Sequence, residues 1–199
     1  TGRLQPLADA AAVSAARARA QGAAALWRGR AAWEVARATG AGWEPASPSG
    51  WLVRDTATAR INPRLALAAL AAAIRAAGGE VTLGAGHADG EGPTAGPVVW
   101  ATGAAGLADL SAALSRPVGG GQKGQAALLA HAAPGAPQLF AGGLHIVPHA
   151  DGTVAVGSTS ERTWRDPAAT DAALDGLVAR ARRICPALQD AAVIARWAG

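Results

Sequence analysis

The chain has 199 residues, of which 50% are hydrophobic and 16% charged; this is enough for one domain or one and a half, and it excludes a disordered protein. The formal net charge is +4, but the basic residues are nearly all arginines scattered singly or in pairs, so no positive run indicates nucleic-acid binding. A single cysteine, Cys185, excludes an internal disulfide and a cysteine-based zinc site.

The sequence carries no targeting or membrane signal. No N-terminal segment has the basic-then-apolar pattern of a secretory signal, and Arg75 interrupts the longest apolar stretch. We therefore expect a cytoplasmic protein with no membrane partner. Because there is no methionine, even at position 1, we also expect a piece of a longer product.

The first sixty residues predict a strand, a helix and a second strand. Residues 3–7 are predicted to form a short strand, and Asp9 is suited to cap a helix over residues 10–26, where alanine and arginine favour helix. Residues 40–50 contain Pro45 and Pro48 and predict a loop, after which residues 51–53 form an extended run.

The middle of the chain has the pattern of an α/β unit. Asn62 followed by Pro63 is typical of a helix start and predicts a helix over residues 64–77. Strands are predicted at residues 81–83 and 97–102, and the second runs through glycines into a helix over residues 107–114.

From residue 119 the pattern changes to short strands separated by Gly, Pro or Asp-Gly, which is typical of an antiparallel sheet. The predicted strands are residues 125–130, 139–140, 144–148 and 153–158, then a helix over 168–184 and a last strand at 192–197. Cys185 and Trp197 are expected in the core. The order antiparallel, α/β, antiparallel predicts two interleaved layers rather than consecutive domains.

Three stretches look like functional motifs, but each lacks a residue or a structural element that the function needs. Residues 84–90 look like a dinucleotide-binding glycine motif, but the third glycine is one residue late and no helix follows, which favours a turn. Residues 119–124 look like a phosphate loop, but Gln125 stands where Ser or Thr should bind magnesium. His145 and His149 flank Pro148 on a predicted strand, so they do not share a helix face, and no metal site is predicted.

The junction at Thr102 and Gly103 is more informative. Where a strand turns through glycines into a helix, α/β folds place ligands, and backbone N–H groups and a Thr hydroxyl there can bind a phosphate or an adenine ribose. Tight packing of the turn is the alternative interpretation.

Five spaced stretches carry a family resemblance. They are residues 60–63 with 79–81, residues 98–104, residues 122–125, residues 145–159, and residues 186–188 with 196–199. In this order and spacing they resemble the motifs of the FAD-dependent amine and amino-acid oxidases, the family of glycine oxidase, D-amino-acid oxidase and sarcosine oxidase. Ala105 departs from the pattern, since it replaces the usual aromatic residue.

The resemblance implies a fold class of mixed α+β and α/β type, in which part of a FAD-binding Rossmann-like domain is interleaved with an antiparallel-sheet substrate domain. Residues 1–58 and 117–199 would belong to the substrate domain, and residues 59–116 to the middle of the FAD-binding domain. The chain stops just before the family's Leu-Arg-Pro, whose arginine binds the substrate carboxylate, and it lacks the family's GxGxxG segment. We therefore expect an internal fragment that is inactive alone and does not bind FAD tightly.

The cofactor implied by the resemblance is FAD. The implied reaction oxidises the C–N bond of a small amine or amino acid, with hydride passing to the flavin, hydrolysis of the imine, and reoxidation by oxygen to give peroxide. By position, Thr102 and Gly103 would contact FAD, the backbone near His87 would lie near the adenine, and Gly124 would sit close to the flavin or its ribityl chain.

The substrate pocket implied by the resemblance includes two further residues. His145 occupies the place of a tyrosine that lines the pocket, and Ser160 would face the same pocket. A plain strand histidine is the alternative for His145. A different class of function also stays open: a non-catalytic domain that binds a small ligand or partner chain without flavin. Formation of a homo-oligomer is left open as well.

Overall fold

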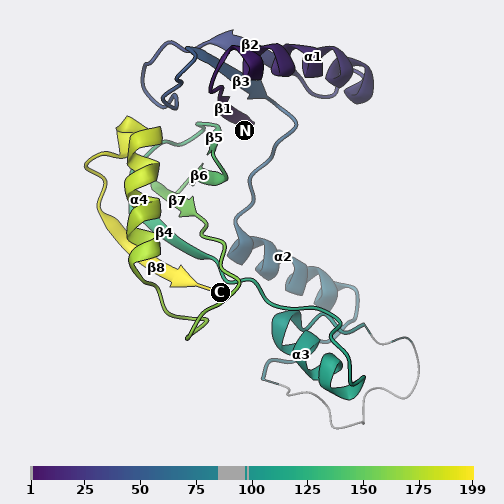
Figure 1. The fold of residues 1–199 in the computed structure, drawn as a ribbon. Coiled ribbons are helices and arrows are strands. Elements are labelled where there is room, and N and C mark those ends of the chain that lie inside the picture. The colour runs from purple at the N-terminus through teal and green to yellow at the C-terminus, as the bar shows by residue number, and fades with distance from the viewer. Residues whose placement is uncertain (1, 85–96, 98) are drawn as a thin grey trace. The chain divides into compact units, whose positions relative to one another are not determined.

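The computed structural model describes residues 2–84, 97 and 99–199. The chain divides into two compact units (Figure 1). The first joins Thr1–Arg60 to Lys123–Gly199, and the second is Ile61–Gln122.

The first unit is built on one mixed sheet. Its strands are β1 (Arg3–Pro6), β2 (Trp33–Arg37), β3 (Trp51–Asp55), β4 (Gln125–Ala130), β5 (Gln138–Ala141), β6 (Leu144–Pro148), β7 (Thr153–Gly157) and β8 (Val193–Ala198). They lie in the order β2-β3-β1-β5-β6-β7-β4-β8. Among the described strands, β1 and β5 pair in parallel and all other neighbours pair antiparallel.

Helix α4 (Ala172–Ile184) covers one face of this sheet and is followed by a short 3-10 turn, Pro186–Leu188. Asp171 caps its N-terminus by accepting a hydrogen bond from the Ala173 N–H. Figure 1 shows α4 lying along β4 and β7. The apolar side chains between helix and sheet form the main core, which includes Leu129, Ile146 and Leu177. Truncating such a leucine or isoleucine to alanine costs about 2–5 kcal/mol, so this packing dominates the stability of the unit.

Helix α1 (Ala10–Trp27), capped by Asp9, covers the opposite face at the β2-β3-β1 end. Val53 packs beneath α1, whereas Leu4 belongs to the core under α4. Leu4 pairs with Arg54 and the next position pairs with Val53, so these two apolar residues point to opposite faces. On the strands β5 to β8, the face turned away from α4 is therefore covered by neither helix.

The second unit contains α2 (Pro63–Ala76) and α3 (Gly103–Ala113). Asn62 caps α2 as predicted, because its side chain accepts hydrogen bonds from the N–H groups of Arg64 and Leu65. Neither helix has a buried residue.

The two strands predicted in the second unit are wrong for the residues that the structure describes. Residues 81–83, 97 and 99–102 have no strand structure, and residue 98 lies outside the described part. A strand needs a hydrogen-bonded neighbour, and no described strand lies between residues 61 and 122 to provide one. The apolar run is accordingly open to solvent, with Val99 87% and Trp100 66% exposed.

Other boundaries shifted by a few residues. Helix α4 starts at Ala172 rather than residue 168, because Asp171 is its cap, and α3 starts at Gly103 rather than residue 107. Strand β2 went unpredicted; in the structure its Trp33 and Val35 pack against the core under α1. In the described part of the chain, no helix has the length and apolar character needed to cross a bilayer.

Candidate functional site

A row of side chains crosses the open face of the sheet. The register aligns Phe140 of β5 with His145 of β6, His145 with Gly157 of β7, Gly157 with Ala126 of β4, and Ala126 with Trp197 of β8. Aligned partners point to the same face, and the neighbouring positions along the strands, such as Ile146 and Val156, are buried under α4. This row, which we call the open-face row, is therefore turned away from α4.

The open-face row has bulky ends and a small middle. Gly157 and Ala126 leave space between His145 and Trp197, and a Cβ added at Gly157 would lie 3.1 Å from the Cβ of Ala126. Trp197 is 46% exposed, so the expectation that it lies in the core is wrong; β8 is an edge strand, and neither α1 nor α4 covers its open face. Cys185, in contrast, is buried in the core as predicted.

His145 stands on β6 with its ring tilted against that of Phe140, at 4.6 Å between ring centroids. Partial burial, and then the nearby positive charge of Arg3, lower the pKa of His145 below its ordinary value. At neutral pH the imidazole is therefore uncharged, and it offers one N–H donor and one nitrogen acceptor to a ligand on this face.

Gly124 lies where the start of β4 meets the last residue and the segment after β7. Its N–H donates to the Gly199 carbonyl at 2.8 Å, and the Gly199 N–H donates back at 3.1 Å. A Cβ at this position would lie 3.3 Å from both the Ser158 Cβ and the Thr159 carbonyl oxygen. Glycine keeps this close approach of backbone segments free of strain.

A buried polar network that the sequence does not predict lies beside Gly124. Gln125 is 0% exposed, and its side-chain nitrogen donates to Glu161 and to Asp171, each at 2.9 Å. Its side-chain oxygen accepts from the Asp171 N–H at 2.9 Å. Lys123 is buried alongside and donates from Nζ to the Asp166 carbonyl at 3.0 Å. This network, the Gln125 clasp, ties β4 to the 158–161 segment and to the start of α4.

Ser160 follows the β7 strand on the segment that the Gln125 clasp holds. It lines a cavity of about 420 Å³ together with Ser158, Gly143 and Arg180 of α4. His145 does not line this cavity, although it pairs in register with Gly157, three residues before Ser160. The common pocket for His145 and Ser160 stays a prediction.

The Thr102–Gly103 junction is a helix start in the second unit. Gly103 has a φ of +65° at the first position of α3, and the Thr102 side chain makes no capping hydrogen bond to the helix. A Cβ at Gly106 would lie 1.6 Å from Thr102 Oγ1, so only glycine allows the hydroxyl this place on the first turn. His87 lies outside the described residues.

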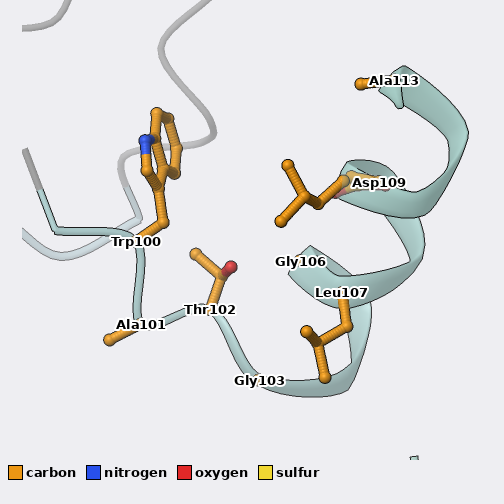
Figure 2. Close-up of a pocket in the computed structure, with 9 residues that line it drawn as sticks. Trp100, Ala101, Thr102, Gly103, Gly106, Leu107, Asp109 and Ala113 are labelled. Carbon is orange, nitrogen blue, oxygen red and sulfur yellow. The ribbon is translucent and has the colours of Figure 1, made fainter. Parts of the chain in front are cut away.

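An apolar cavity of about 680 Å³ opens at this helix start (Figure 2). Trp100 stands on one side of it, and Leu107, Asp109 and Ala113 belong to the α3 side. An apolar wall beside a hydroxyl and the N–H groups of a first helical turn suits a ligand with both an aromatic ring and a phosphate.

A model of one protein family matches the whole chain. The family model described as "FAD dependent oxidoreductase" matches residues 1–199, the whole chain. The chain belongs to this family.

Relatives of known activity are similar to part of the chain. A glycine oxidase of Pseudomonas aeruginosa is 38% identical, and one of Pseudomonas putida 40% identical, each over 78 residues. These matches cover 39% of this chain and 21% of each relative. The chain thus spans about a fifth of the length of the curated relatives it matches.

Solved structures of the same fold cover the chain completely. The crystal structure of glycine oxidase from Geobacillus kaustophilus matches with a TM-score of 0.68 at 22% identity. The match covers 100% of this chain and 58% of the glycine oxidase chain. The crystal structure of iminodiacetate oxidase from Chelativorans sp. matches with a TM-score of 0.68 at 20% identity. This match covers 100% of this chain and 59% of the iminodiacetate oxidase chain. They confirm the predicted fold class, a mixed sheet with helices.

The residues at the start of α3 fit the cofactor of this FAD-dependent oxidoreductase family. FAD carries an adenine ring, a ribose and a diphosphate, and the apolar cavity, the Thr102 hydroxyl and the uncapped first turn of α3 match those groups in kind. A Cβ at position 106 would collide with the Thr102 hydroxyl, so glycine at this position allows the hydroxyl to lie beside the first turn.

Proposed function

We propose that this FAD-dependent oxidoreductase oxidises the C–N bond of a small amine or amino acid, and that the chain supplies one wall of its substrate site and part of its cofactor site. The match of the family model to all 199 residues carries the proposal. When bound, FAD would supply the two-electron acceptor for this oxidation, with oxygen as the final acceptor, and the substrate would leave as an imine that water hydrolyses.

For the cofactor, Thr102 and Gly103 are proposed to hold part of FAD through the hydroxyl and the helix N–H groups, with the backbone near His87 close to the adenine. Gly124 is proposed to lie close to the flavin or its ribityl chain. Its place two residues before Ala126 of the open-face row supports this.

For the substrate, His145 is proposed to orient the amine or carboxylate by hydrogen bonding from an uncharged imidazole. The lowered pKa of His145 supports this role, because an uncharged ring can both donate and accept. Ser160 is proposed to line the same pocket from the segment after β7.

The test is the visible absorption spectrum of the purified full-length protein, recorded anaerobically before and after addition of small amino acids and amines. Flavin bands that bleach with one of these compounds are expected, and the bleaching compound identifies the substrate. A colourless protein that gains no flavin bands on incubation with FAD would contradict the proposal and favour a ligand- or partner-binding domain without flavin.

A further inference from the structure

A fixed positive charge stands at the β1 end of the open face. Arg3 of β1 is the register partner of Asp55 of β3, and its Nε donates to Asp55 Oδ2 at 2.8 Å. Asp55 is 2% exposed, so this carboxylate is buried and needs its cation. The Arg3 side chain is 24% exposed and stays within reach of a ligand.

Asp55 is itself held in place. Its second oxygen, Oδ1, accepts hydrogen bonds from the Thr58 N–H at 3.0 Å and the Thr58 hydroxyl at 2.5 Å. Both carboxylate oxygens are therefore engaged, and Arg3 is anchored through Nε. Among the described residues, the two terminal nitrogens of Arg3 have no hydrogen-bond partner.

Arg3 is continuous with the open-face row. Its guanidinium carbon lies 5.6 Å from the centre of the Phe140 ring, and that ring contacts the His145 ring. One face of the sheet therefore carries a cation, an aromatic ring and an uncharged imidazole side by side, from Arg3, Phe140 and His145. A ligand that contacts His145 lies one aromatic ring away from a guanidinium whose outer fork is free to bind an anion.

We propose that Arg3 is a specificity-determining residue that makes this site select dicarboxylic substrates, amino or imino acids with a second carboxylate remote from the reacting nitrogen. This rests on the proposed function. A carboxylate pairs with a guanidinium fork through two parallel charge-assisted hydrogen bonds, whereas an aliphatic substituent would cover the charge without replacing its water. Arginine suits this position because its Nε binds Asp55 while its two terminal nitrogens are left to bind a ligand. Lysine has one nitrogen and cannot bind both groups in this way.

The experiment measures ligand binding to the full-length protein, independent of turnover. The dissociation constants of succinate and propionate are obtained from the ring signals of His145 in NMR titrations, with His145→Gln used to assign the signals. Arg3→Met combined with Asp55→Asn removes both charges together, so that no buried carboxylate is left unpaired. Arg54→Leu is the matched control, because Arg54 is an exposed arginine one residue from Asp55 that points to the other face.

Succinate is expected to bind the natural protein about 10- to 100-fold more tightly than the Arg3→Met/Asp55→Asn variant, with propionate nearly unchanged. Arg3→Lys is expected to recover only part of the difference, and Arg54→Leu to behave as the natural protein. Equal succinate affinity in the natural protein and the double variant would overturn the proposal, as would failure of succinate to bind at all. Because binding is read without flavin reduction, a protein that binds succinate through Arg3 but never bleaches would refute the proposed oxidation alone.

Discussion

At the scale of single residues, Cys185 is a thiol whose reactivity the fold suppresses. It is buried at the C-terminal end of α4, and burial raises the pKa of its thiol to about 11. The thiolate is the reactive form, so we expect Cys185 in the folded chain to react with a disulfide reagent at pH 8 at least about 100-fold more slowly than a free thiol. The absorbance of the released thiol measures the rate.

The same chain unfolded in guanidinium is the control, and there the thiol should react at the ordinary rate. A fast reaction in the folded chain would show that the end of α4 opens readily and would contradict the closed core around Cys185.

The residues of the candidate site differ in how far the sequence could predict them. The sequence places His145 on a strand and Thr102 at a junction between a predicted strand and a helix, because strand alternation and glycine turns are local signals; the structure confirms the strand at His145 and the helix after Thr102. Nothing local marks Arg3 or Gln125. Arg3 depends on a partner 52 residues away, and Gln125 on partners 36 and 46 residues away, so only the fold brings them together.

At the scale of elements, the Gln125 clasp couples the start of β4 to the start of α4. Gln125→Ala would leave the Asp171 N–H and two carboxylate oxygens without their buried partner, so we expect a loss of about 2–4 kcal/mol of unfolding free energy. Urea titration of the 199-residue chain measures it. Gln189→Ala, at an exposed glutamine, is the control and should change stability by less than about 0.5 kcal/mol.

The natural chain and the Gln125→Ala variant should also differ in how their unfolding free energy depends on pH. Hydrogen bonds from Thr159 and Gln125 lower the pKa of Glu161, and one from Gln125 lowers that of Asp171. Groups with lowered folded-state pKa values stabilise the fold above their unfolded pKa, near pH 4, and lose that contribution as the pH falls through the folded pKa. Gln125→Ala should therefore flatten the loss of stability below about pH 4. An unchanged slope would show that the clasp does not set these pKa values.

The elements predicted best are those with a local signal and a partner in the described chain. Strands β4 to β7 and the caps of α1 and α2 were predicted within a few residues. The predictions at residues 81–83 and 97–102 failed because an apolar run specifies a buried strand only where neighbours bind it. Composition at those positions says nothing about which neighbours are available.

At the scale of the whole molecule, the two units differ in how their helices are protected. Helices α2 and α3 have no buried residue, whereas β4, β6 and β7 share the core under α4. We expect the amides of α2 and α3 in the 199-residue chain to exchange with deuterium at least about 10-fold faster than those of β6 and β7. Exchange followed by mass spectrometry at peptide resolution measures this difference.

Helix α1 is an internal control for that measurement, since it is a surface helix of the first unit that buries Val13 and Ala16. It should fall between the two groups. Equal protection of α2 and β6 would contradict the difference in burial.

The position of β1 affects how the protein is made. β1 is synthesised well before its parallel neighbour β5, and it lies inside the sheet, with Arg3 aligned to Gln138 of β5. Its antiparallel neighbour β3 follows early, but translation of the intervening chain delays β5 by roughly 7 to 27 s at 5–20 residues per second. During that time the β1 edge offers unpaired N–H and C=O groups to any other extended chain. Until β5 is synthesised, β1 is therefore open to mispairing, and a holding chaperone should act on residues 1–60.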